Sequence, residues 1–303
     1  MKKIAVILSV YCGESYISDF MDSLCLQSER RFTLFVRDDG SCDNSLQLIR
    51  SYSSLLNIVF VEGNIRIGPA MSFMRLLSVV PDSYSYFFFA DQDDYWHPQK
   101  IKTAVSELSS YEDRPALYCS RLELVDVELN HLSYTKIPKI LNFSNALVEN
   151  IATGCTVAIN FRARNILLNH MPNRIVMHDW WMYVVISAFG VVLYDKNSYI
   201  KYRQHGANVI GMDSNFFRDY FNRAVRFFKS DSVSSSSISM QSIEFFQCFS
   251  RCMTENQTNL VLQLIEGKTS FLKRCYLIFF SKFRRQNFFS NCVLKFRFLI
   301  NRY

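Results

Sequence analysis

An apolar, aromatic run that ends in a cluster of carboxylates constrains this chain more than any other stretch. The run Tyr86–Ala90 has the length of a strand that is buried on both faces of a parallel sheet. Asp91, Gln92, Asp93 and Asp94 follow it at once. Ligands of open α/β sheets bind at the carboxyl ends of the strands. The acids therefore predict a ligand site at that edge, because carboxylates crowded together need a cation or a hydrogen-bonding partner.

A hard divalent cation suits such a site, since Mg²⁺ and Mn²⁺ prefer oxygen ligands and keep positions open for substrate phosphates. The alternative is that acids after a strand cap the next helix, and Trp96–Lys100 looks like a helix start. We accept capping for Asp94 alone. For the three acids together we favour the cation site.

The first hundred residues alternate between strand-like and helix-like patterns. Strands are expected at 4–10, 32–36 and 57–61 before the aromatic strand, with helices at 16–26, 43–52 and 68–77 between them. This alternation predicts an α/β fold with a doubly wound, mostly parallel central sheet. A second acidic pair, Asp38-Asp39, follows the strand at 32–36. Two acidic strand ends then face the same ligand site.

Length, cysteine content and hydropathy limit the class of protein. At 303 residues the chain can form one large α/β domain with an appendage. Its nine cysteines lack CxxC spacing, which favours reduced thiols in a cytosolic protein over disulfides or a zinc site. We interpret the first ten residues as a core strand rather than a signal peptide. The sequence contains no uninterrupted apolar run long enough for a membrane span.

The net charge of +7 is concentrated in one part of the chain. Residues 216–303 contain 14 Lys and Arg against 5 Asp and Glu, and the basic residues alternate with aromatic ones. Amphipathic helices of this composition bind anionic membrane surfaces. The alternative is a helical layer that packs on the catalytic domain. Nucleic acid is not expected as a partner, because the acidic edge of the sheet would repel it.

Six short segments combine charged or polar residues with glycine or aromatic residues. They are Ser9-Val10-Tyr11 with Glu14, Asp38-Asp39-Gly40-Ser41, Asn64 to Gly68, Asp91-Gln92-Asp93, His178-Asp179-Trp180-Trp181 and Arg203-Gln204-His205-Gly206. In this order they resemble the motifs of family 2 glycosyltransferases of the bacterial rhamnosyltransferase-like type, which have the GT-A fold. The resemblance covers residues 3–212. The QxxRW motif of processive synthases is absent, so a polymerising activity is not expected.

The resemblance implies a GT-A catalytic domain over residues 1–212, Rossmann-like with helices flanking the sheet, and a helical basic-aromatic extension over 213–303. It also implies roles for individual residues. Asp93 and His205 would bind Mn²⁺ or Mg²⁺, and Asp39 would contact a uracil or thymine base. The full set expected to bind the donor nucleotide is Ser9, Tyr11, Glu14, Asp39, Asn64, Arg66, Gly68 and Asp91.

Asp179 is the expected catalytic base, which would take the proton from the acceptor hydroxyl as it attacks the anomeric carbon. On position alone, this acid is either a helix cap or a base. A single base opposite the leaving group predicts inversion without a covalent intermediate. The diphosphate or acceptor loop is expected to include His178, Trp180, Trp181 and Arg203.

The sequence thus predicts a metal-dependent hexosyltransferase for bacterial surface polysaccharide, such as O-antigen or capsule. The expected donor is dTDP-L-rhamnose, with a UDP-hexose open, and the expected acceptor is a lipid-linked saccharide. The expected location is the cytoplasm, peripheral on the inner face of the cytoplasmic membrane. One alternative is a nucleotidyltransferase acting on sugar phosphates, although Ser9–Glu14 does not supply its glycine-rich phosphate loop. Another is a non-enzymatic polyanion-binding protein, which leaves the acidic edge unexplained.

Overall fold

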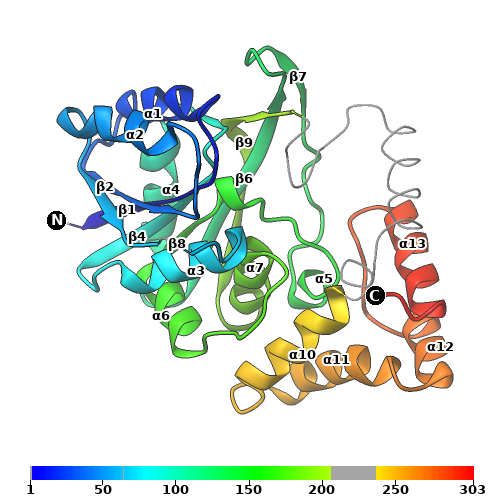
Figure 1. Cartoon of the computed structure of the whole chain (residues 1–303). Helices are drawn as coiled ribbons and strands as arrows, with labels where there is room; N and C mark the ends of the chain where they lie inside the picture. The colour runs from blue at the N-terminus through cyan, green and yellow to red at the C-terminus, as the bar shows by residue number, and fades with distance from the viewer. Residues whose placement is uncertain (1, 64, 206–236) are drawn as a thin grey trace.

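The computed structural model describes residues 2–63, 65–205 and 237–303. Nine strands form one sheet in the order β3-β2-β1-β4-β8-β6-β9-β5, with β7 paired to β6 (Figure 1). The strands are β1 (Lys3–Val10), β2 (Phe32–Asp38), β3 (Ile58–Val61), β4 (Tyr84–Ala90), β5 (Tyr95–Trp96), β6 (Ala116–Val125), β7 (His131–Tyr134), β8 (Ala158–Asn160) and β9 (Val191–Arg203).

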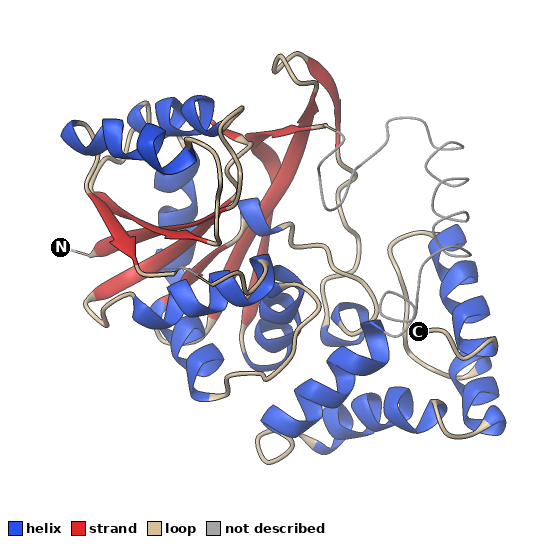
Figure 2. Ribbon diagram, viewed as in Figure 1, coloured by secondary structure: helices blue, strands red, loops and turns tan. Residues whose placement is uncertain are grey.

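Helices cover both faces of this sheet (Figure 2). They are α1 (Ile17–Cys25), α2 (Ser45–Ser51), α3 (Pro69–Val79), α4 (Lys100–Leu108), α5 (Phe143–Ala146), α6 (Phe161–Asn169) and α7 (His178–Phe189). The extension adds α10 (Ser237–Phe249), α11 (Glu255–Gly267), α12 (Phe271–Phe279) and α13 (Phe288–Leu299).

The first half of the sheet is parallel, as predicted. β1 pairs in parallel with β2 on one side and with β4 on the other, and β3 extends the sheet beyond β2. Val10 lies opposite Asp38, and Leu8 lies opposite Ala90. The carboxyl ends of three strands therefore meet at one edge, on either side of the point where the strand order reverses. Beyond β4 the sheet is mixed, because β8 runs antiparallel between β4 and β6.

The aromatic run explains how the sheet is buried. Tyr86, Phe88 and Ala90 point into the core beneath α1 and α4, whereas Phe87 and Phe89 point into the core beneath α3 and α7. Side chains of a strand alternate between the two faces of its sheet. All five residues are almost completely buried, so β4 has the two-sided burial that the sequence predicts.

Helix α10 belongs to the same hydrophobic core as α3 and α7. Phe245 and Phe249 of α10 contact Trp181 of α7, each with a ring-centroid distance of 6.2 Å, and both also contact Phe189. The packing alternative is therefore correct for α10. The expected boundary between residues 212 and 213 lies outside the described residues. Within the described ranges, no helix is both long enough and apolar enough to cross a membrane.

This shared core predicts cooperative unfolding. Replacing Phe245 by Ala should lower the free energy of unfolding by about 3–5 kcal/mol, because a large aromatic group leaves a packed cluster. Phe271→Ala is the control, since that ring is exposed, and its effect should stay within about 0.5 kcal/mol. Urea unfolding followed by tryptophan fluorescence and by far-UV circular dichroism should give one transition. Two separate transitions, with only one shifted by Phe245→Ala, would contradict this expectation.

Candidate active site

The loops that follow β1 and β4 are joined at the edge of the sheet. The Gln92 side-chain amide donates to the Tyr11 carbonyl oxygen at 2.9 Å and accepts from the Tyr11 N–H at 3.0 Å. Gly13 makes this contact possible, because a Cβ at that position would lie 2.4 Å from Gln92 Cδ. The middle residue of the Asp91-Gln92-Asp93 motif thus fixes the loop that carries Tyr11.

Asp39 fastens the segment before α3 to the end of β2. Its carboxylate accepts hydrogen bonds from the Ile67 N–H at 2.8 Å and the Gly68 N–H at 2.9 Å, and from Arg37 Nη1 at 2.7 Å. Burial alone would raise the pKa of Asp39, but these three donors lower it below its usual value. Gly68 has φ of +79°, a conformation that favours glycine. Arg37 Nη1 also donates a hydrogen bond to the Ser72 hydroxyl. The Ser9 hydroxyl donates to the same Ser72 oxygen at 2.6 Å.

The other residues expected to bind the donor nucleotide lie at or near the same edge of the sheet, where the parallel strands have their carboxyl ends. Glu14 accepts a hydrogen bond from Asn44 Nδ2 at 2.7 Å, which joins the β1 and β2 loops. The Arg66 guanidinium lies over the Tyr11 ring, 4.1 Å from its centroid, and both side chains are exposed. Asn64 is outside the described residues. The structure therefore places Ser9 near the end of β1, Tyr11 and Glu14 in the loop after β1, and Asp39 directly after β2. Arg66 and Gly68 lie in the loop between β3 and α3.

The two expected metal ligands meet although they are far apart in the sequence. His205 Nε2 lies 2.8 Å from Asp93 Oδ2, and the His205 ring stacks on Tyr16 with a centroid distance of 4.7 Å. Arg203 reaches the same place: its Nε donates to the Asp93 carbonyl oxygen at 3.0 Å, and its Nη2 pairs with Asp19 at 2.6 Å. Arg203 thus fixes the backbone of the acidic loop. Its expected contact with the diphosphate stays a prediction.

Beneath this loop lies a buried group of two acids, a lysine and a cysteine. Asp94 is completely buried, and its carboxyl oxygens have no hydrogen-bond partner with normal geometry among the described residues. It caps no helix, because α4 begins six residues later with Gln99 as its N-cap, so our capping interpretation of Asp94 is wrong. Lys100 Nζ donates to the Cys155 carbonyl oxygen at 2.9 Å.

The electrostatics of this buried group favour neutral acids. Burial, and then the charge of Asp93, raise the pKa of Asp91 to about 8, and the same two causes raise the pKa of Asp94 well above its usual value. Burial also lowers the pKa of Lys100 to about 8, although the neighbouring acids oppose this shift. The Lys100 ammonium therefore offsets only part of the negative charge of the acidic loop.

Asp179 and His178 enter the site from the beginning of α7. Asp179 Oδ2 accepts from the Gly154 N–H at 2.9 Å, and Oδ1 accepts from the Trp180 N–H at 2.6 Å. Burial raises the pKa of Asp179 to about 6, although these bonds oppose the shift. The charge of Asp179 contributes to the raised pKa of Asp91, so the two carboxyl groups are within electrostatic reach.

His178 is buried against Phe73, and burial lowers its pKa to about 3, so the imidazole is neutral. Its Nε2 would lie 2.9 Å from a Cβ on residue 154, which explains the glycine there. The Trp180 Nε1–H donates to the Ala146 carbonyl oxygen at 2.7 Å, and Trp181 is fully buried against α10. The two tryptophans therefore belong to the core in this structure, whereas the Asp179 carboxylate accepts a hydrogen bond from the segment at Gly154.

Three residues of the site were missed from the sequence. Lys100 begins an amphipathic helix, where a lysine normally indicates an exposed face. Cys155 follows a glycine, and Tyr16 precedes α1. Neither position lies in a local sequence pattern that marks it as part of a site. All three are recognisable only through the tertiary contacts of Lys100 with Cys155 and of Tyr16 with His205.

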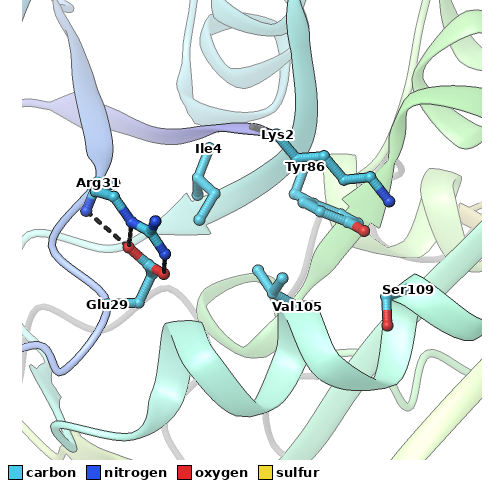
Figure 3. A pocket seen from close by; sticks show the side chains of 7 residues that line it. All are labelled: Lys2, Ile4, Glu29, Arg31, Tyr86, Val105 and Ser109. Atoms are coloured by element: carbon cyan, nitrogen blue, oxygen red, sulfur yellow. Dashed lines mark hydrogen bonds and ion pairs between the residues drawn. The ribbon is translucent and has the colours of Figure 1, made fainter.

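The two cavities described in the structure lie at other places. One of about 230 Å³ is lined by residues near the amino ends of β1 and β4, including Lys2, Ile4 and Tyr86 (Figure 3). The other, of about 340 Å³, also involves Lys2 and Tyr86. Ligands of this type of sheet bind at the opposite edge, so we assign neither cavity to the acidic site.

Comparison with known proteins agrees with this geometry. Residues 5–170, more than half of the chain, match the model of the family described as glycosyl transferase family 2. The chain belongs to this family. The predicted family is thereby confirmed, and the match covers β1 from residue 5 onward, β2, β3 and β4 with the loops that follow them.

Relatives and solved structures extend the comparison of this family 2 chain. It is 28% identical over 232 residues to the dTDP-rhamnosyl transferase RfbG of Shigella flexneri, covering 70% of this chain and 76% of that protein. The crystal structure of residues 1–349 of TarS from Staphylococcus aureus superposes with a TM-score of 0.60 at 16% identity, covering 93% of this chain and 76% of TarS 1–349. The complex of the same TarS fragment with UDP-GlcNAc gives a TM-score of 0.57 at 15% identity, covering 99% of this chain and 91% of that one. At this identity the TarS structures support the fold.

The contact between Gly13 and Gln92 allows a specific test of how the family 2 loops are joined. Gly13→Ala should lower the free energy of unfolding by about 1–3 kcal/mol, because the added Cβ forces Gln92 away from Tyr11. In a Gln92→Ala background the space is free, so the same glycine substitution should cost little. A double-mutant cycle measured by urea unfolding should therefore give a coupling energy of about 1–2 kcal/mol. Additive effects would show that the contact does not join the loops.

Proposed function

We propose that this protein is an inverting, metal-dependent hexosyltransferase that moves a sugar from a nucleotide-sugar donor to a lipid-linked saccharide. The observation that carries the proposal is the placement of Asp179. This carboxyl group has a pKa of about 6 and lies within electrostatic reach of Asp91, yet it comes from α7 rather than from the acidic loop. A single displacement at the anomeric carbon needs a base on the acceptor side, opposite the leaving group, and the carboxylate from α7 is our candidate for that base.

The acids and the histidine at the predicted donor-binding site fit a divalent cation. Asp93 and His205 already lie 2.8 Å apart, and the pKa values of the buried Asp91 and Asp94 are raised by burial and by the charge of Asp93. An added cation would relieve that repulsion. Asp93 and His205 would hold Mn²⁺ or Mg²⁺, with Asp91 toward the ribose. When bound, the ion supplies electrostatic stabilisation of the leaving diphosphate.

The protein's own residues perform the remaining steps. The loops that contain Ser9, Tyr11, Glu14 and Arg66 bind the nucleotide, and Asp39 holds the segment ending at Gly68 in place. Asp179 takes the proton of the acceptor hydroxyl during its attack on the anomeric carbon. His178, Trp180, Trp181 and Arg203 keep the diphosphate and acceptor side of the site in position. One displacement inverts the anomeric centre.

For the donor we favour dTDP-L-rhamnose, because RfbG, described as a dTDP-rhamnosyl transferase, is 28% identical over most of both chains. A UDP-hexose is the second candidate, since the similarly folded TarS fragment binds UDP-GlcNAc. The lipid-linked acceptor places the protein in surface polysaccharide synthesis, such as O-antigen or capsule, on the inner face of the cytoplasmic membrane. Residues 1–212 would form the transferase domain, and 213–303 an extension that associates with the membrane.

Two other functions agree less well with the site. A nucleotidyltransferase for sugar phosphates would need a phosphate-binding loop after β1, but the N–H groups of Cys12, Gly13 and Glu14 donate to Ser41, Ser45 and Asp43. A non-enzymatic polyanion-binding protein would have no use for buried acids beside Lys100. Neither alternative gives a role to the buried carboxyl group of Asp179.

The first experiment is calorimetric titration of the protein with dTDP and with UDP, each with and without Mn²⁺. We expect Mn²⁺-dependent binding, tighter for dTDP, because the leaving diphosphate and the cation bind together. Asp93→Asn is the control variant and should abolish the effect of Mn²⁺. Absence of binding by either nucleotide, with the fold intact, would reject the transferase proposal.

Asp179→Asn should reduce turnover by about 10²–10⁴-fold, because the amide cannot accept the proton. Its side-chain oxygen can still accept from Gly154, so donor binding and thermal stability should stay close to the parent values. In the parent protein kcat/KM should fall as the pH drops below about 6, since protonated Asp179 is not a base. Near-normal turnover of Asp179→Asn, or a rate independent of pH between 5 and 7, would remove Asp179 from this role.

A further inference from the structure

The helices α12 and α13 expose an unusual amount of apolar surface. In α12 and the residue after it, Leu272 is 78% exposed, Phe279 is 69% and Phe280 is 73%. Tyr276 and Phe280 touch, with ring centroids 5.8 Å apart, and Phe279 contacts Phe280, so the rings form a continuous cluster. In α13 and the residue after it, Phe288 is 84% exposed, and Leu299 and Ile300 are also exposed. Clusters of this kind on a folded protein mark interaction sites.

This exposure does not come from a failure of the two helices to pack. Leu277, Phe283, Leu294, Phe298 and Tyr303 of the same region are buried. The Tyr303 hydroxyl donates to the Leu264 carbonyl oxygen at 2.9 Å, and Phe298 packs edge-to-face on Tyr303. The exposed rings are therefore a second, outward set beyond those that hold the helices together.

The charge along this stretch is almost entirely positive, although Lys273 is paired with Glu266 of α11 at 2.7 Å. Residues 268–303 contain no Asp or Glu and nine cations: Lys268, Lys273, Arg274, Lys282, Arg284, Arg285, Lys295, Arg297 and Arg302. Exposed aromatic rings among cations fit the boundary between anionic lipid headgroups and acyl chains. A second copy of this face fits poorly, because the like charges of two copies would repel each other.

The turn between α12 and α13 is joined to the catalytic domain. Gln286 Oε1 accepts from the Lys139 and Ile140 N–H groups at 2.7 and 3.1 Å, and its Nε2 donates to the Ile140 carbonyl oxygen at 2.7 Å. The Gln286 N–H donates to Glu149, and Arg285 Nε donates to the Val148 carbonyl oxygen.

The same part of the catalytic domain continues to the candidate base. Residues 139–149 lead toward Gly154, whose N–H donates to Asp179 Oδ2 at 2.9 Å. Asn145 accepts from the Tyr183 hydroxyl at 3.0 Å and donates to the Arg284 carbonyl oxygen at 2.8 Å. A short chain of contacts thus connects the turn at 284–286 to α7.

We propose that the exposed face of α12 and α13 docks on an anionic lipid bilayer, and that the turn at 284–286 fixes the acceptor side of the active site relative to that bilayer. The inference rests on the proposed transfer to a lipid-linked acceptor. Docking defines the height and orientation of Asp179 above the headgroups. Residues 139–150 then form the wall of the site nearest the membrane-bound acceptor.

The experiment measures sedimentation of the full chain with vesicles of phosphatidylcholine, with and without 30% phosphatidylglycerol. Binding should require the anionic lipid, and Phe279→Glu/Phe280→Glu should weaken it at least tenfold. Lys282→Gln should weaken binding about fivefold, the factor that corresponds to about 1 kcal/mol per cation. Leu55→Glu is the matched control, because Leu55 is 60% exposed outside the extension, and its binding should not change.

Two results would overturn docking: equal binding to neutral and anionic vesicles, or binding that Phe279→Glu/Phe280→Glu leaves unchanged. Self-association that the same variant abolishes, without vesicle binding by the parent, would assign the face to a second copy instead. Turnover with a water-soluble acceptor should be the same for the parent and this variant. If no acceptor is turned over while anionic vesicles are still bound, the proposed function fails and docking stands.

The positioning part is tested with Gln286→Ala. Vesicle binding and the KM for the donor should remain unchanged, whereas the KM for a lipid-linked acceptor should rise about fivefold or more. A loss of stability alone would instead lower all activities together, which thermal unfolding would detect. An unchanged KM for the acceptor would overturn the connection between the turn and the active site.

Discussion

The structure depends on the crowding of three carboxyl groups at the end of one buried strand. β4 is enclosed on both faces, so Asp94 emerges completely buried and Asp91 and Asp93 emerge partly buried, where water screens their charges less than in bulk. The protein meets this constraint with one buried ammonium from Lys100 and with hydrogen bonds that fix the surrounding loops. The remaining imbalance makes the edge receptive to a cation, and the transferase proposal follows from it.

Around that edge, parts of the chain that are far apart in the sequence are held together by single residues. Arg203 ties the end of β9 to the acidic loop and to α1 through Asp93 and Asp19. Trp181 ties α7 to α10 on the other side of the same helix that presents Asp179. The helix that contains the candidate base is therefore packed against the core of the sheet and against α10 at once.

Much of this could be read from the sequence, for physical reasons. The strands β1, β2 and β4 are continuous apolar runs followed by polar turns, and parallel pairing brings such ends together without knowledge of side-chain packing. Asp93, Asp179 and His205 can be predicted as site residues because each lies in a recognisable local pattern, and their roles stay predictions. The burial of Asp94 was not predictable, since an acid before a helix ordinarily caps it. Nor was the partnership of Lys100 with Cys155, because it depends on contacts over 55 positions.

The hydrogen bonds and the ion pair of Asp39 have a consequence for how sugars are discriminated. The segment that ends at Gly68 is held by two backbone hydrogen bonds and an ion pair within the protein alone. A ligand that contacts this segment finds Ile67 and Gly68 already held in place, so the ordering of these two residues costs no further entropy. Preorganisation of this kind strengthens binding of every nucleotide that fits the shared framework. Discrimination between sugars must then arise from side chains that touch the hexose itself, and that small set is where related enzymes can diverge without rebuilding the fold.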